Sequence, residues 1–197
     1  MNKIIKAIVS ITLLVSNAMA FQSEQNYTLK FGISLNSVLA SANTSWSATE
    51  FSNGIEESPT LGVTIKGIYE REIYRASLDI EQAKWDKASY TEFKIAGDYL
   101  YNYKEVKYYG GLGVGTLNFS EDHTDKSSSN IAYELRGGVL LKNIPFASYK
   151  FPQNVELELG YRYKIINAKN SEVIQSSTHK VSLESAHVLS MGFNYSF

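Results

Sequence analysis

Alternation of apolar and polar residues with a period of two is the feature that most constrains how this chain can fold. In residues 155–165, apolar or aromatic residues occupy the odd positions, and Glu156, Glu158, Arg162 and Lys164 stand between them. Seven further segments show the same pattern: 27–36, 61–69, 74–81, 92–101, 106–116, 131–141 and 181–197. No helical stripe of comparable length competes with them, so the sequence predicts an all-β protein with eight strands.

The lengths and connections of these segments favour a closed barrel in a membrane. Strands of about 10 to 12 residues cross a bilayer when tilted, and an even number of strands leaves both termini on one side. The connections 39–59, 119–130 and 166–179 are long and polar, whereas 70–73 and 102–105 are tight turns. We therefore predict an eight-stranded antiparallel up-and-down transmembrane β-barrel with periplasmic termini. A short outer loop at 84–89 and a long inner turn at 142–153 depart from this scheme.

The first twenty residues predict secretion. Lys3 and Lys6 precede an apolar run at 8–15, and Ala18-Met19-Ala20 forms a small-residue cleavage site. We expect a signal peptide at 1–20, a barrel domain at 21–197, and residence in the outer membrane of a Gram-negative bacterium. The chain has no cysteine, which excludes a disulfide scaffold, a cysteine zinc site and a lipoprotein anchor. Its 19 basic and 20 acidic residues argue against a nucleic-acid partner.

Charged residues on the polar faces of the strands predict a filled lumen. Eight are basic and eight are acidic: Lys30, Lys66, Arg75, Lys94, Lys107, Arg136, Arg162 and Lys164, against Asp79, Glu81, Glu92, Asp98, Glu134, Glu156, Glu158 and Glu184. An eight-stranded barrel is only wide enough to be filled by its own side chains. We therefore expect an internal ion-pair network, with Glu158 and Arg162 as preferred members, and poor ion conduction. A soluble lipocalin-like barrel or β-sandwich with a solvated polar face is the competing interpretation.

Aromatic residues near the predicted strand ends suggest two girdles at the membrane interfaces. The expected periplasmic girdle comprises Tyr27, Tyr69, Tyr74, Tyr99, Tyr101, Tyr108, Tyr195 and Phe197. The outer girdle is thinner, and its candidates are Trp85, Phe119 and Tyr133.

Several of these features together resemble the small OmpA-type and opacity-protein-like outer-membrane barrels. They are the signal peptide, the eight amphipathic strands, the glycine-studded run 109–115, the strand segment 159–163 and the ending 191–197. The resemblance covers the mature chain but includes no peptidoglycan-binding domain. It implies that Phe193, Tyr195 and Phe197 form a signal for the barrel-assembly machinery, and that outer-membrane lipid and lipopolysaccharide surround the wall. Members of this broad family act as surface antigens, adhesins, complement-resistance factors or structural proteins.

Two classes of function remain open from the sequence. In the first, the outer loops contact a host protein or glycan, with Trp46, Phe51 and Ile55 as candidate contacts, although these residues could equally cap the barrel mouth. In the second, a lipid-A deacylase-like site would use His187 with Ser185 or Ser190. His123 lies in an acidic loop that could bind a cation only weakly, and the run 110–115 lacks the features of a nucleotide loop. We therefore expect no enzyme, cofactor or metal, and a narrow pore is a further alternative.

Overall fold

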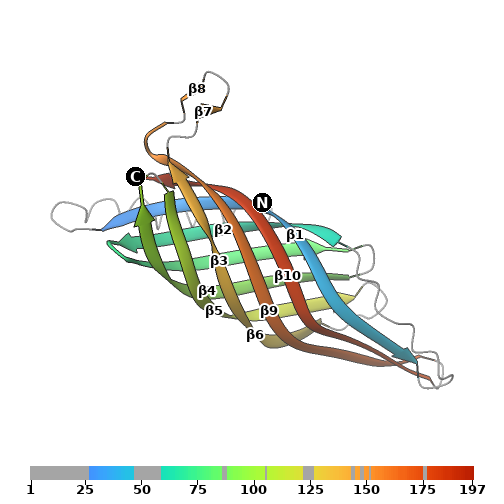
Figure 1. The fold of residues 1–197 in the computed structure, drawn as a ribbon. Helices are drawn as coiled ribbons and strands as arrows, with labels where there is room; N and C mark the ends of the chain where they lie inside the picture. Colours follow the sequence, from blue (N-terminus) through green and yellow to red (C-terminus); the bar gives the residue numbers. More distant parts are fainter. Residues whose placement is uncertain are drawn as a thin grey trace, which may run out of the picture.

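Eight long strands close into an antiparallel barrel in the computed structural model, which describes residues 27–46, 59–85, 88–104, 106–121, 127–142, 145–146, 149–150, 152–174 and 177–197 (Figure 1). They are β1 (Thr28–Trp46), β2 (Pro59–Arg71), β3 (Tyr74–Lys84), β4 (Ala88–Tyr103), β5 (Val106–Glu121), β6 (Ser127–Lys142), β9 (Val155–Ile174) and β10 (Ser177–Ser196). Each strand pairs with its neighbour along the chain, and β10 closes the barrel on β1. The predicted fold class is thereby confirmed.

The long inner turn contains a small hairpin of its own. Strands β7 (Pro145–Phe146) and β8 (Tyr149–Lys150) form a separate two-stranded sheet. Figure 1 shows this hairpin beyond the end of the barrel where the C-terminus lies. Within the described ranges, no helix is long and apolar enough to cross a membrane.

The stagger of the strands decides which side chains meet inside. Following paired residues once round the barrel from Leu29 on β1 returns to Leu39, ten residues further along the same strand. Such a stagger tilts the strands against the barrel axis. Residues paired across neighbouring strands therefore climb towards the outer end as one goes round, which the sequence pattern alone does not reveal.

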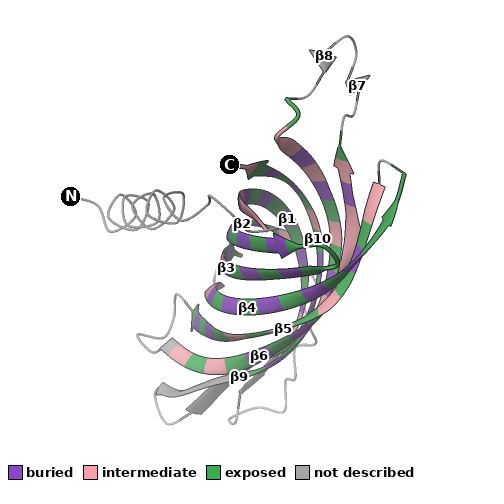
Figure 2. Ribbon diagram, turned by 90° about the vertical axis from the view of Figure 1, so that its left-hand side faces the viewer, coloured by how far each residue is buried: buried purple, intermediate pink, exposed green. Residues whose placement is uncertain are grey.

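The wall has two chemically distinct faces. Buried and exposed residues alternate along the strands, as Figure 2 shows for β2, β3 and β4. Large apolar residues such as Leu78, Ile95 and Leu112 are more than 60% exposed on the outside. A belt of this extent is unsuited to water and matches the lipid-facing band of a transmembrane barrel.

Aromatic residues behave as expected at only one end. Tyr69, Tyr74, Tyr99, Tyr101 and Tyr108 are all exposed towards the periplasmic end, in agreement with the predicted girdle.

The predicted outer girdle is largely wrong. Tyr133 is exposed, but Phe119 is 2% exposed and lies inside the barrel, where Trp85 packs against the same internal cluster. Rings at the extracellular ends of the strands can turn inwards because the lumen there is apolar.

Several strands extend further than expected. β1 continues to Trp46, β9 continues to Ile174 and β10 begins at Ser177, so most of the predicted loop 166–179 and residues 39–46 of the predicted loop 39–59 are paired strand. Residues 119–121 and 127–130 of the predicted loop 119–130 likewise belong to β5 and β6. We call residues 42–46, 167–174 and 177–184 the extracellular wing, which reaches past the other strands in Figure 1. Polar alternating sequence beyond the membrane resembles loop sequence, which explains the error. Phe51, Ile55 and His123 lie outside the described residues.

A bulge at the base of the wing reverses which face is buried. The pairing register slips between Ser41 and Ala42 on β1 and between Leu183 and Ser185 on β10. Leu183 is consequently buried inside the barrel, whereas Glu184 is exposed. The prediction that Glu184 faces the lumen is therefore wrong, because one extra residue shifts the alternation within the segment 181–197.

Candidate functional site: the filled lumen

The lumen contains equal numbers of basic and acidic side chains. Counted over the described residues, its cations are Lys30, Lys66, Arg75, Lys94, Lys107, Arg136, Arg162 and Lys164, and its anions are Glu70, Asp79, Glu81, Glu92, Asp98, Glu134, Glu156 and Glu158. Glu70 takes the place that the sequence pattern assigned to Glu184. It stands at the end of β2, next to a tight turn, where the alternating pattern is easily overlooked.

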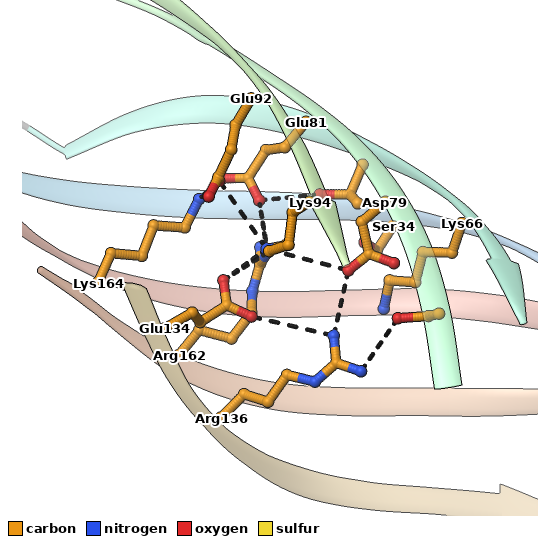
Figure 3. Close-up of polar contacts among 12 residues, drawn as sticks. Ser34, Lys66, Asp79, Glu81, Glu92, Lys94, Glu134, Arg136, Arg162 and Lys164 are labelled. Carbon is orange, nitrogen blue, oxygen red and sulfur yellow. Dashed lines mark hydrogen bonds and ion pairs between the residues drawn. The ribbon is translucent and has the colours of Figure 1, made fainter. Parts of the chain in front are cut away.

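Glu81 on β3 is the most heavily shared anion. It accepts hydrogen bonds from Arg162 and from Lys164, the latter at 2.8 Å (Figure 3). The Tyr90 hydroxyl donates a further hydrogen bond to Glu81 at 2.5 Å. Lys164 also donates to Glu92. These contacts tie β3 and β4 to β9 across the lumen, so they join strands that do not pair through their backbones.

Lys94 and Glu134 add a second link at the same level. The Lys94 Nζ lies 2.5 Å from a Glu134 carboxylate oxygen, and Arg162 lies 3.6 Å from the same carboxylate. All three side chains are almost fully buried. The outer part of the ionic network is therefore dry and compact.

Asp98 is the centre of the next cluster. Both of its carboxylate oxygens accept hydrogen bonds from Arg136, at 2.6 and 2.7 Å, and Arg75 donates a further bond at 2.7 Å. Arg136 also reaches Asp79 at 3.1 Å and Ser77 at 3.0 Å. A bidentate guanidinium–carboxylate pair of this kind constrains geometry strongly.

Glu158 and Arg162, the preferred members, do not pair with each other. Glu158 accepts hydrogen bonds from Lys66 at 2.9 Å, the Tyr109 hydroxyl at 2.8 Å and Asn194 at 2.9 Å. Arg162 belongs to the Glu81 cluster instead. Their separation follows from the stagger of the strands, since residues on one strand face partners at different heights.

The ionic network ends at the periplasmic mouth. Lys30 lies 2.6 Å from both Glu70 and Glu156, and Lys107 pairs with Glu70. The more exposed Lys142, which is not one of the eight lumen cations, lies 3.2 Å from Glu156. Of the sixteen charged residues that the sequence assigned to the lumen, fifteen belong to this network, from its periplasmic mouth to the level of Glu92, and Glu184 is exposed.

The extracellular half of the lumen is filled by apolar side chains, which the sequence analysis missed. The cluster comprises Val38, Ala40, Ala83, Tyr90, Leu117, Phe119, Ala132, Ile166, Ala168, Leu183, Ala186 and Val188. We call it the apolar layer; it separates the ionic network from the extracellular loops. The sequence signal that could have revealed the apolar layer is alanine at inward positions of five strands, because a solvated lumen would carry polar residues there.

Three glutamates in the lumen could in principle hold a metal ion. Carboxylate oxygens of Glu81, Glu92 and Glu134 lie within 4.8 Å of one another. Lys94 and Lys164, however, already contact these carboxylates at hydrogen-bonding distance. A cation would have to displace them, so the donor set does not fit a metal.

His187 lies on the outer wall among aromatic rings. The Tyr161 hydroxyl is 2.7 Å from His187 Nδ1, and the ring of Tyr163 is 5.0 Å away between centroids. The Ser190 hydroxyl donates to the Gly160 carbonyl at 3.3 Å. The histidine is thus engaged by tyrosine, and the Ser190 candidate is directed elsewhere.

Comparison with solved structures finds the same architecture. The crystal structure of Neisserial surface protein A is 19% identical with a TM-score of 0.58, covering 88% of this chain and 98% of that chain. Ail of Yersinia pestis is 14% identical with a TM-score of 0.45, covering 89% and 100%, and OprG of Pseudomonas aeruginosa is 16% identical with a TM-score of 0.44, covering 87% and 95%. Neither family models nor curated proteins give a match.

Fold, wall and lumen define the class of protein as a small eight-stranded outer-membrane β-barrel. The likeness to Neisserial surface protein A confirms the expected fold, that of a small outer-membrane barrel.

Proposed function

We propose that this barrel serves as a surface-exposed structural or interaction protein through its extracellular end. The observation that carries the proposal is the filled lumen: ion pairs occupy it from the periplasmic mouth to Glu92, and the apolar layer fills the rest. Its outer wall is apolar and faces lipid. Neither surface is therefore free for a soluble partner, which leaves the extracellular end.

The extracellular wing supports this assignment. Its three strands are hydrogen-bonded to each other from the bulge to the pair Trp46–His179 on β1 and β10, and to the pair Ile174–Ser177 on β9 and β10. A paired sheet holds the loops at its tip on a rigid base, which favours binding by loop residues. Trp46, one of the three candidate contacts, stands at the end of β1. The occupant we propose is a host protein or glycan.

Removal of residues 48–57 tests the proposal without cutting into β1 or β2. The control replaces the same residues with a glycine–serine linker of equal length. We expect both variants to fold, seen as heat-modifiable migration on a gel, and to lose binding to host cells, matrix proteins or glycans that the wild type binds. Unchanged binding by a folded deletion variant would contradict an interaction through this loop.

The enzymatic alternative is tested separately. Replacing His187 by Ala should leave the mass spectrum of lipid A from the producing cells unchanged, because His187 is engaged with Tyr161 and Tyr163. A change in lipid A acylation that appears with the wild type and disappears with His187→Ala would establish an enzyme instead.

The assembly machinery is the second partner we propose. Phe197 follows the last strand, its ring packs edge-to-face on Tyr195 at 5.2 Å, and its backbone N–H donates to Leu29. Deleting Phe197 should lower the folded yield in cells far more than the stability of protein refolded in detergent. Equal losses in both settings would mean that the residue acts by packing alone.

A further inference from the structure

Two apolar grooves on the lipid-facing wall join over Gly67. The larger has a volume of about 710 Å³ and the smaller about 310 Å³, and both are lined by Gly67, Leu78 and Ile95. These residues are cross-strand neighbours on β2, β3 and β4. We call the joined grooves the outer-wall furrow.

Gly67 forms the floor of the furrow. A side chain added at Gly67 would meet no atom within 4 Å, so its absence leaves open space on the outside of the wall. The neighbouring strands rise on either side of it with Leu78, Ile95 and, at the larger groove, Phe31. The depression is therefore created by the missing side chain between large apolar ones.

The chemistry of the furrow is that of hydrocarbon. Lys30, Asp79 and Lys94 also line it, but their side chains are buried in ion pairs of the lumen and present no charge outwards. A ligand that required hydrogen bonds would find few partners here. An alkyl chain requires none.

The position of the smaller groove, at the periplasmic end of the furrow, indicates from which membrane leaflet an alkyl chain would enter. There the furrow is bounded by Tyr69 and Phe197, which lie at the periplasmic girdle where lipid headgroups meet the hydrocarbon. The larger groove continues from this point as far as Thr116 and Ile131. A chain that enters at the girdle can thus lie along the furrow with its headgroup at the inner interface.

We propose that the outer-wall furrow binds one acyl chain of an inner-leaflet phospholipid as a specific site. The bound lipid covers the thin part of the wall over Gly67. It differs from surrounding lipid because it is held in a groove and not merely against a convex surface, so it exchanges more slowly.

Substitution of Gly67 by Leu fills the furrow and tests the proposal. Gly110→Leu is the matched control, since Gly110 is exposed on the same wall, also has nothing within 4 Å, and lies in neither groove. Proteins are taken from vesicles of phosphatidylethanolamine and phosphatidylglycerol and studied by native mass spectrometry. We expect one retained phospholipid on the wild type and on Gly110→Leu. For Gly67→Leu the retained fraction should fall about tenfold, which corresponds to the free energy of burying nearly two methylene groups.

Equal retention by all three proteins, or none by the wild type, would overturn the proposal. So would retention of lipopolysaccharide instead of phospholipid from cell-derived protein, or a dimer that Gly67→Leu abolishes. If Gly67→Leu fails to fold, photoreactive phospholipid decides the matter on the wild type. Its adducts should concentrate on Phe31, Leu78 and Ile95, and uniform labelling that includes the exposed Leu159 and Ile165 of β9, the strand opposite β3 in the barrel, would contradict a site.

Discussion

The two halves of the lumen are filled in opposite ways. The periplasmic and central part is ionic, with Glu81, Asp98 and Glu158 each shared by several cations, whereas the extracellular part is the apolar layer. The outer face of a transmembrane barrel is covered by lipid, so the packed core of the protein has to lie inside the lumen. The apolar layer thus supplies the dry core that a soluble domain would have, and the ionic half supplies directional contacts.

The difference suggests a division of roles. A buried ion pair adds little to the free energy of unfolding, because desolvation of the two charges offsets most of their attraction. Removing one partner, however, leaves a buried unpaired charge and destabilises the fold strongly. Glu81 is reached by Arg162 and Lys164 across the lumen, so these contacts specify which strands lie opposite each other. We infer that the ionic half fixes register, while the apolar layer contributes volume-dependent packing energy.

The largest effect is expected from Glu81→Ala. It would leave Arg162 and Lys164 with fewer acceptors in a dry environment and lower the free energy of unfolding by about 3 to 5 kcal/mol. Urea unfolding in detergent, followed by gel migration, measures it. The control is Glu72→Gln in the exposed turn after β2, for which an equal loss would show that the ionic half has no special role.

Leu117→Ala in the apolar layer should cost about 2 to 4 kcal/mol, because Leu117 is fully buried and its removal leaves a cavity. Leu112→Ala on the same strand is the matched comparison, since Leu112 is 67% exposed to lipid. The same unfolding assay should give a clearly smaller loss for Leu112→Ala. The reverse order would mean that the apolar layer is not packed as a core.

Gly138→Ala tests how closely the ionic half of the lumen packs against the wall. Its new methyl group would stand 2.2 Å from the Leu159 carbonyl and 2.8 Å from the Tyr109 ring, whose hydroxyl donates to Glu158. We expect a loss of about 1 to 3 kcal/mol from this overpacking. Gly137→Ala, with its nearest contact at 3.3 Å, should be milder, and equal losses would argue against close packing of Tyr109.

Lys142→Gln should have the smallest effect. Its side chain is 43% exposed and its pair with Glu156 is at the mouth, where water screens it, so the loss should be below about 1 kcal/mol. The shift in the urea midpoint should shrink further at high salt. A loss comparable with that of Glu81→Ala would show that the contribution of the ion pairs to the free energy of unfolding does not increase from the periplasmic mouth to the centre of the lumen.

Sequence periodicity predicts the strands and most of the lumen charges because inward and outward residues alternate strictly within the membrane. Partners could not be predicted, since the ten-residue stagger sets which acid meets which base. The apolar layer was missed for two reasons. Phe119 is an aromatic residue near a strand end, as girdle residues are, yet it is buried inside the barrel. The bulge near Glu184 reverses the alternation of the segment 181–197, so Leu183 faces the lumen. Neither effect leaves a local sequence signal as strong as the period of two.

Planar-bilayer recording on the purified barrel tests the central claim most directly, namely that ion pairs and the apolar layer together close the lumen. We predict no stable single-channel current for the wild type. The current should stay absent when only the apolar layer is opened by Leu117→Ser together with Phe119→Ser, in protein that still migrates as folded, because ion pairs still fill the lumen from the periplasmic mouth to Glu92. Large, stable currents from the wild-type barrel would contradict the account.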